Sequence, residues 1–306
     1  MLRSARFALT SPESGKAMSM IRTLIQKFLK LICTFDYLLS TNKEMTVLNY
    51  PTSKISEIFC IVSHSKTIKI EKNVVDCLNS MKAVGLTTVL ITNYEMQHKK
   101  LADIVVQKGA KGRDLAAMRD FVRSTKFLNS KNLQIIYIND SCYWDSSKLV
   151  NSYKRLSESP LNTFYFPTQS MYPVKHVQPY FFYIKVNKES IPRFALSLEW
   201  VKNYRLKRSL VLFGEYEMEK NLFKQGWDVH LLANYSDVIL AENILRSLNL
   251  EQPLDPNCLR YNPTQHCWRV LPKFQIPGIK KSLIERNPYG ISGLPRSLAD
   301  LDEYFR

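Results

Sequence analysis

The chain has 306 residues, 45% of them hydrophobic, so it is long enough to bury one large core or two small ones. Its 43 Lys and Arg residues exceed its 27 Asp and Glu residues, and the formal net charge of +16 favours polyanionic partners: nucleic acid, an anionic membrane surface or the phosphates of a nucleotide sugar. The six cysteines show no C-x-x-C spacing, which excludes a disulfide framework and the usual zinc patterns and indicates a reducing compartment.

Residues 1–50 are predicted to form a disordered polar tail followed by a basic amphipathic helix. Within residues 17–35, apolar side chains recur at helical spacing, but Arg22, Lys27 and Lys30 interrupt them and make the segment a poor transmembrane span. The pattern suits a helix lying on a membrane surface, and equally a helix packed on the protein's own core. A signal peptide is disfavoured because no cleavage site of the small-residue type follows.

Residues 51–306 are predicted to form a single α/β domain. Apolar runs typical of buried strands occur at 58–62, 87–93, 103–110 and 135–139, and amphipathic helix patterns separate them. Because most of these runs are continuously apolar, they indicate a Rossmann-type, mostly parallel sheet with helices on both faces. The chain contains neither a G-x-G-x-x-G fingerprint nor a P-loop.

The sequence changes character after about residue 160. An aromatic segment with several prolines, at 163–186, leads to a helix pattern and then to a predicted strand that ends near Gly214. A further predicted helix follows and stops at Gly226. Residues 251–306 are Pro-rich with little periodicity, so they are expected to be an irregular extension that wraps the domain.

Polar side chains follow several of the predicted strands at the point where each strand ends. These candidate ligand-binding residues are Ser63, His64, Asn93, Lys111, Gly112, Arg113, Asp114, Asn139, Asp140 and Ser141. Because the carboxyl ends of parallel strands share one edge of a sheet, the groups should converge on a cleft. Taken singly, Asp114 is more typical of a helix N-cap, and the run from Asn139 to Ser141 is typical of a turn. Lys111 and Arg113, beside helix amides, suit a diphosphate.

A second group of candidates lies later in the chain. His176, Gln178, Tyr180 and Phe182 fall on one side of a predicted strand, which favours a wall facing an acceptor or, equally, a sheet face packed under the C-terminal extension.

Three glutamates, at 215, 217 and 219, surround the start of the next predicted helix. Acidic residues there complement the helix dipole without any chemistry, but one of them facing the cleft would make a suitable general base. We favour Glu217 for this role, with His176 second.

These motifs, in their order and spacing, resemble the rhamnan-synthesis protein F family, a group of polysaccharide glycosyltransferases with a GT-A-like fold. The matching pieces are "IVSHS", "LNSMKAVGLTTVLITN", "KGAKGRDLAAMRDF", "IIYINDSCYW", "HVQPYFFYIK", "GEYEMEKNLFKQGW" and "NPTQHCWRVLPKFQIPGIKKSLIERNPYGI". They span about residues 55–292. Two departures occur: Lys108 and Ala110 replace the Arg and Asn of the family pattern Arg-x-Asn-x-Gly-Arg-Asp, and Pro179 replaces the Ser of His-x-Gln-Ser-Tyr-Phe.

The resemblance implies transfer of a sugar, such as rhamnose or another deoxyhexose, from a nucleotide-sugar donor to a surface polysaccharide or lipid-linked glycan. We expect an inverting, cytoplasmic enzyme, peripheral on the inner face of the membrane through residues 17–35. Asp140 is expected to contact the donor sugar or a divalent metal, Mn²⁺ or Mg²⁺, although no second carboxylate follows at Asp-x-Asp spacing. Gln178 and Tyr180 are expected to bind the acceptor.

Two other classes of function compete with glycosyl transfer. The net charge of +16 favours a nucleic-acid-binding protein, but the Lys and Arg residues are spread along the chain and no recognition motif is present, so no nucleic acid is expected. A catalytically silent scaffold of a glycan-assembly complex would keep the fold without donor hydrolysis.

Overall fold

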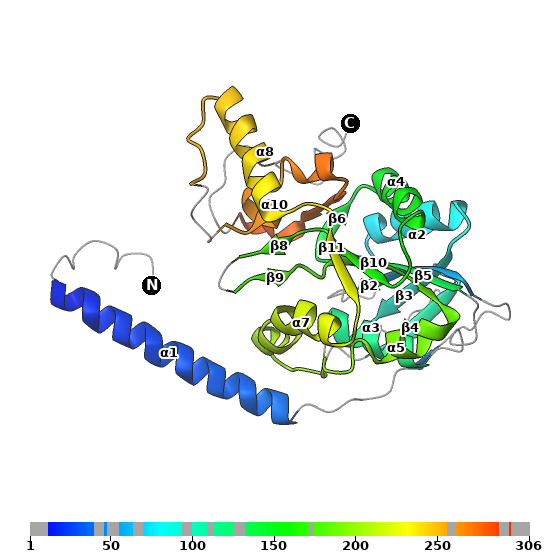
Figure 1. The fold of residues 1–306 in the computed structure, drawn as a ribbon, viewed down its shortest axis with the longest axis horizontal. Coiled ribbons are helices and arrows are strands. Elements are labelled where there is room, and N and C mark those ends of the chain that lie inside the picture. Colours follow the sequence, from blue (N-terminus) through cyan, green and yellow to red (C-terminus); the bar gives the residue numbers. More distant parts are fainter. Residues whose placement is uncertain are drawn as a thin grey trace.

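The computed structural model describes residues 12–39, 46–47, 55–63, 70–93, 100–108, 113–124, 132–171, 174–255, 261–287 and 294. Within them, an eight-stranded sheet in the order β1-β4-β3-β2-β5-β10-β7-β11 forms the centre (Figure 1). Its strands are β1 (Thr46–Val47), β2 (Glu57–Ser63), β3 (Thr87–Thr92), β4 (Ile104–Gln107), β5 (Asn132–Asn139), β7 (Thr163–Phe166), β10 (Phe181–Asn187) and β11 (Asp228–Leu231). Two small antiparallel ladders join β6 (Cys142–Trp144) to β12 (Gly278–Lys280) and β8 (Gln169–Ser170) to β9 (His176–Val177).

The described helices and helical turns are distributed along the whole chain. They are α1 (Pro12–Leu39), α2 (Lys72–Ala83), α3 (Arg113–Ser124), α4 (Ser146–Ser157), α5 (Ile191–Leu196), α6 (Lys207–Leu210), α7 (Tyr216–Lys224), α8 (Tyr235–Leu248), α9 (Pro263–His266) and α10 (Lys281–Arg286), with short turns η2 (Lys188–Ser190) and η4 (Leu271–Phe274) and a π-helical turn η3 (Val211–Glu215). Helices α2 and α4 lie on one side of the sheet, and α3, α5 and α7 lie on the other (Figure 1).

Strand directions identify the type of fold. Strands β2, β3, β4 and β5 are parallel, whereas β10 is antiparallel to both of its neighbours, β5 and β7, and β11 is parallel to β7. Leaving aside the two-residue β1, the strands numbered along the chain stand in the order 3-2-1-4-6-5-7. The prediction of a Rossmann-type, GT-A-like α/β fold with a mostly parallel sheet is confirmed.

The continuous apolar run in β2 reflects a strand that is covered on both faces. Successive side chains of a strand point to opposite faces, so Phe59 and Ile61 pack toward α2 and α4 while Cys60 and Val62 pack toward α3. All four side chains are fully buried. A one-sided sheet would have required a polar residue at every second position.

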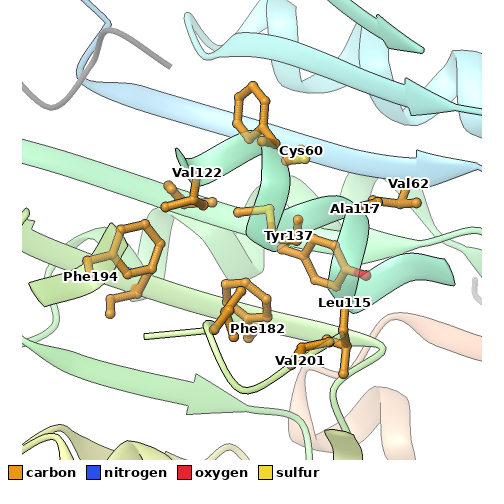
Figure 2. Close-up of a cluster of buried hydrophobic side chains, with 14 of the residues drawn as sticks. Cys60, Val62, Leu115, Ala117, Val122, Tyr137, Phe182, Phe194 and Val201 are labelled. Carbon is orange, nitrogen blue, oxygen red and sulfur yellow. The ribbon is translucent and has the colours of Figure 1, made fainter. Parts of the chain in front are cut away.

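Figure 2 shows the core on the α3 side. Cys60 and Val62 of β2 lie near Tyr137 of β5, and Leu115 of α3 lies on the other side of Tyr137, beside Val201. The Tyr137 ring stacks on Phe182 of β10 at a centroid distance of 4.7 Å, so the antiparallel β10 is tied to the parallel half of the sheet through side chains as well as backbone. The rigid sheet that results positions the polar residues at its carboxyl edge.

Two predicted elements differ from the structure. The strand expected before Gly214 is helical, since α6, η3 and α7 run on without a break. A short apolar run is compatible with either a strand or a buried helix, and here Leu210, Gly214 and Met218 recur at helical spacing on the buried face. The segment from His176 to Phe182 is not one strand either, because β9 ends at Val177 and β10 begins at Phe181.

The C-terminal extension contributes a strand to the domain. β12 pairs antiparallel with β6, and the ring of Trp144 lies directly over Gly278. Trp144 is almost fully buried, its Nε1–H donates to the carbonyl of Asn139 at 2.8 Å, and its backbone exchanges two hydrogen bonds with the side-chain amide of Asn73. The extension is therefore attached through a tightly packed indole next to the end of β5.

The C-terminal part of α1 is attached to the domain. The carboxylate of Asp36 accepts hydrogen bonds from the backbone N–H groups of Arg205 and Leu206 at 3.1 and 3.0 Å, and Cys33 is buried. The helix extends outward from this contact (Figure 1). Among the described residues, no helix combines the length and the low polarity that crossing a bilayer requires.

We predict that Gly278→Ala destabilises the protein. A Cβ at this position would lie 2.6 Å from Cζ3 of Trp144, and the indole has no room to move because its N–H and backbone are hydrogen-bonded. Overpacking of this kind lowers the free energy of unfolding by about 1–3 kcal/mol. Urea denaturation measures the change, and the exposed Lys273→Ala in the same segment serves as a control. A Gly278→Ala protein as stable as the control would contradict the packing described here.

Candidate functional site

A cleft of about 950 Å³ opens at the carboxyl edge of the sheet. Asn93, Asp114, Asn139, Asp140 and Ser141 line one wall, at the ends of β3 and β5 and the start of α3. The β9–β10 connection, the α6–η3–α7 segment and the C-terminal β12–α10 segment form the rest of the lining. The opposite edge of the sheet, where the parallel strands begin, contributes none of these residues.

A chain of hydrogen bonds crosses the floor of this cleft. The ammonium of Lys280 donates to Oγ of Ser141 at 2.9 Å, and that hydroxyl donates to Oδ1 of Asn139 at 2.6 Å. The amide Nδ2 of Asn139 then donates to Oδ2 of Asp114 at 2.6 Å. This series of hydrogen bonds runs from a cation to a carboxylate, and each bond in it joins a donor to an acceptor.

Asp140 is held beside this chain by β2. Its backbone N–H donates to the carbonyl of Val62 at 3.0 Å, and Oγ of Ser63 donates to its Oδ2 at 2.9 Å. Ser63 thus orients the Asp140 carboxylate, which lines the cleft. A carboxylate fixed in this way can accept hydrogen bonds from the hydroxyl groups of a sugar.

The β9–β10 connection supplies polar groups that have no partner among the described residues. Nε2 of Gln178 donates to Oδ1 of Asn262 at 2.9 Å, but Oε1 of Gln178 and the hydroxyl of Tyr180 are buried without a hydrogen bond to any described residue. Burial raises the pKa of Tyr180 well above its usual value. Buried polar atoms without partners are costly.

The surroundings of His176 favour its neutral form. Its Nδ1–H donates to the carbonyl of Val174 at 2.7 Å, which leaves Nε2 as an acceptor, and the ring packs 4.6 Å from that of Tyr216. Burial lowers the pKa of His176, and the hydrogen bond to Val174 opposes this only in part.

Glu215 lies in the cleft, at the end of the π-helical turn η3. Removal from water raises the pKa of its carboxyl group and nearby Asp114 raises it further, while the ammonium groups of Lys280 and Lys207 oppose the shift. A carboxylate with a raised pKa is a stronger base, and π-helical turns occur often at functional sites.

Glu217, the glutamate favoured by sequence, is placed differently. It belongs to α7 and does not line the cleft. Its side chain is 42% exposed and pairs with Lys220 at 3.1 Å. From the sequence alone Glu215 cannot be ranked above Glu217, because the residues before Gly214 are predicted to be a strand and in the structure are helical. The position of Glu215 directly after the buried Gly214 is the feature that would have distinguished it.

The structure brings together most of the residues predicted for the site. Those that line the cleft are Asn93, Asp114, Asn139, Asp140, Ser141, His176, Gln178 and Tyr180, and Ser63 contacts it through Asp140. His64, Lys111 and Gly112 lie outside the described residues, as does the side chain of Arg113. Lys280, which sequence reasoning missed, occurs in the "GIKK" of the last matching piece.

The charged residues of the cleft do not form a metal-binding cluster. Among the residues that the structure describes, no three His, Cys, Asp or Glu side chains group together in a way that could hold a metal ion. Cationic and anionic side chains are equally numerous in the described lining of the cleft. The cations are Lys207, Lys280, Lys281 and Arg286, and the carboxylates are Asp114, Asp140, Glu215 and Glu285. These residues do not fit a divalent ion held by the protein alone, and metal contact by Asp140 stays a prediction.

Comparison with known proteins gives little further information. No family model and no curated protein matches the chain, so membership of the rhamnan-synthesis protein F family stays a prediction. Among solved structures, the chain is similar to the mannosyltransferase PcManGT from Pyrobaculum calidifontis in complex with GDP-Man and Mn²⁺, with 13% identity, a TM-score of 0.31, and coverage of 79% of this chain and 76% of that chain. A likeness at this level says nothing about the donor, acceptor or metal of this chain.

We predict that Glu215→Gln stabilises the protein at neutral pH. Because the pKa of Glu215 is raised in the folded state, the native protein binds more protons than the unfolded chain between the ordinary value of 4.5 and the raised one. The wild-type free energy of unfolding therefore falls as pH increases through that range, whereas glutamine does not titrate. Melting temperatures from pH 4 to pH 8 should show equal stability at the acid end and a more stable variant above it. A variant less stable than wild type at pH 7 would contradict the pKa shift.

Proposed function

We propose that the protein is a glycosyltransferase that uses a nucleotide-sugar donor in the cleft at the carboxyl edge of its sheet. The observation that supports this most directly is the hydrogen-bonded chain from Lys280 to Asp114, flanked by Asp140 and facing Glu215. It combines a cation suited to phosphates, acceptors suited to sugar hydroxyl groups and a base. Open α/β sheets bind ligands at this edge.

The donor would occupy the wall formed by the strand ends. Asp140 and Asn93 offer oxygen atoms to the sugar hydroxyls, and Lys280 and Lys207 offer positive charge to the diphosphate. Equal numbers of cationic and anionic side chains line the described cleft, which favours a ligand that has both phosphate and hydroxyl groups over a simple polyanion. This balance also argues against the alternative of a nucleic-acid-binding cleft.

The acceptor would lie against Gln178 and Tyr180, with Glu215 as the general base. In an inverting transfer, the acceptor hydroxyl oxygen attacks the anomeric carbon while the bond between that carbon and the diphosphate oxygen breaks. The hydroxyl proton passes to the Glu215 carboxylate, and the bonding electron pair leaves with the diphosphate. Nε2 of His176, whose Nδ1–H is used by the carbonyl of Val174, is the second candidate for accepting this proton.

The resemblance found in the sequence supports the finer parts of this proposal. It favours rhamnose or another deoxyhexose as the transferred sugar, and a surface polysaccharide or lipid-linked glycan as the acceptor. The Mn²⁺ or Mg²⁺ ion that the resemblance implies, with Asp140 as its ligand, has no support from the residues that line the described cleft, and no step of this proposal depends on it.

We predict that Glu215→Gln lowers kcat by at least about 100-fold and leaves donor affinity unchanged, because the variant keeps the shape of the side chain but cannot accept a proton. A thermal-shift screen identifies the nucleotide sugar that binds, and release of nucleoside diphosphate from it gives kcat. Glu217→Gln is the matched variant, since Glu217 is exposed outside the cleft.

The pair of variants separates the possible outcomes. A normal kcat in Glu217→Gln together with a lowered kcat in Glu215→Gln supports Glu215 as the general base. The reverse result would favour Glu217, the base predicted from the sequence. A protein that binds nucleotide sugars but never releases diphosphate would be the silent scaffold. A protein that binds none would contradict the proposed function.

The outer face of α1 supports a further part of the proposal, peripheral membrane contact. Apolar side chains on this face are exposed to between 37% and 67%: Leu24, Phe28, Leu31, Ile32, Phe35, Leu38 and Leu39. Lys27 and Lys30 are exposed on the same helix. Exposed apolar side chains at helical spacing, together with basic residues, suit a helix lying in the interface of an anionic bilayer. A lipid-linked acceptor would then reach the enzyme at the membrane surface.

We predict that replacing Leu24, Phe28 and Leu31 together by Ser lowers binding to phosphatidylglycerol-rich vesicles by at least about 100-fold, since each buried apolar side chain contributes about 1.5–3 kcal/mol. Co-sedimentation measures the binding. The control carries Ser at three apolar positions of α8 that are at least half exposed: Leu240, Ile244 and Leu248. Wild-type protein that does not bind these vesicles, or an α1 variant that binds as well as wild type, would contradict membrane contact through α1.

A further inference from the structure

Lys280 is brought to the end of β5 by the pairing of two short strands. In the β6–β12 ladder, Lys280 stands directly opposite Cys142, and the next backbone N–H, that of Lys281, donates to the carbonyl of Ser141 at 3.0 Å. The Lys280 ammonium contacts Oγ of Ser141 and lies 4.5 Å from the centre of the Tyr180 ring. Backbone pairing, a hydrogen bond and a ring thus position one ammonium group at the cleft wall.

The ammonium of Lys280 forms no direct ion pair in the described part of the structure, although Glu215 lies near enough to feel its charge. No described carboxylate lies within 4.0 Å of its ammonium, whereas the neighbouring Lys281 is paired with Glu71. Lys280 is only partly exposed. A cation that has lost part of its hydration without gaining a carboxylate attracts an anionic ligand strongly, because the interaction is screened less than at an open surface.

The position of Lys280 is also informative. Asp140 is followed by Ser141 and Cys142, so the place where an Asp-x-Asp pair would have its second carboxylate holds a thiol. Cys142 is buried in the core and burial raises its pKa, so it does not contribute a thiolate. The residue paired with Cys142 across the ladder is the lysine, and the positive charge at this strand end is therefore part of the chain itself.

We propose that Lys280 binds the diphosphate of the nucleotide donor and supplies the positive charge that a divalent ion would otherwise bring, so that donor binding does not require metal. This proposal rests on the proposed function. The ammonium has donors beyond the one used by Ser141, and these bind phosphate oxygens. Ser141, itself held by Asn139, keeps the ammonium beside the strand end where the diphosphate would lie. The same charge stabilises the diphosphate as it leaves.

Calorimetric titration of the full chain in EDTA tests this. The probes are UDP, GDP, thymidine diphosphate and inorganic pyrophosphate, with the parent nucleosides as uncharged references. We expect at least one nucleoside diphosphate to bind in EDTA. Lys280→Met should weaken that binding by about 10- to 100-fold and leave nucleoside affinity unchanged, because only the charged contact is lost. Lys280→Arg should retain most of the affinity.

Lys273→Met is the matched control, since Lys273 is exposed in the same C-terminal segment and does not line the cleft. Nucleotide binding that appears only when Mn²⁺ or Mg²⁺ is added, with equal affinity for Lys280→Met and the control, would overturn the role of Lys280 and leave the proposed function intact. Absence of any nucleotide binding, with or without metal, would overturn both. Melting curves of each variant separate loss of binding from loss of folding. If Lys280→Met does not fold, the test rests on Lys280→Arg: loss of nucleoside diphosphate binding in this folded variant would overturn the role of the Lys280 charge.

Discussion

The hydrogen-bonded chain from Lys280 through Ser141 and Asn139 to Asp114 is the interaction on which the candidate site depends. It joins the C-terminal extension, the end of β5 and the start of α3, which are far apart in the sequence. Asn139, in the middle of this series of hydrogen bonds, is held in place because its backbone carbonyl accepts a hydrogen bond from the indole N–H of Trp144. The same indole packs over β12 and so sets the position of Lys280. The packing of Trp144 therefore fixes the positions of both Asn139 and Lys280, and with them the geometry of the hydrogen bonds at this edge.

The charges in the cleft oppose one another in a way that suits transfer chemistry. The ammonium of Lys280 acts to lower the pKa of Glu215, yet burial dominates and the pKa stays raised. A base and an anion-binding cation thus share one cleft without neutralising each other through an ion pair. Such an arrangement costs stability in the unliganded protein, which is a common property of sites that bind charged ligands.

Much of the fold and one wall of the site were predictable from the sequence, for local reasons. Continuous apolar runs identified the parallel strands because each strand is buried on both faces. Asp114, Asn139 and Ser141 could be assigned to a common edge because parallel strands end together. The proposed general base could not be assigned from strand ends, because it lies on a helix. Glu215 and Glu217 are two positions apart on a helix, which turns about 200° between them, and only the packing of that helix decides which of the two faces the cleft.

The sequence by itself determined the alternation of strands and helices, the carboxyl edge as the place for a ligand, and the polar residues that follow the strands. Only the tertiary structure decided that a C-terminal strand returns to pair with β6, and that Lys280 meets Ser141 across a separation of 139 residues. The physical reason is that periodicity and strand ends are properties of neighbouring residues. The pairing of distant segments depends instead on how large side chains such as Trp144 pack in three dimensions, which the order of residues does not display.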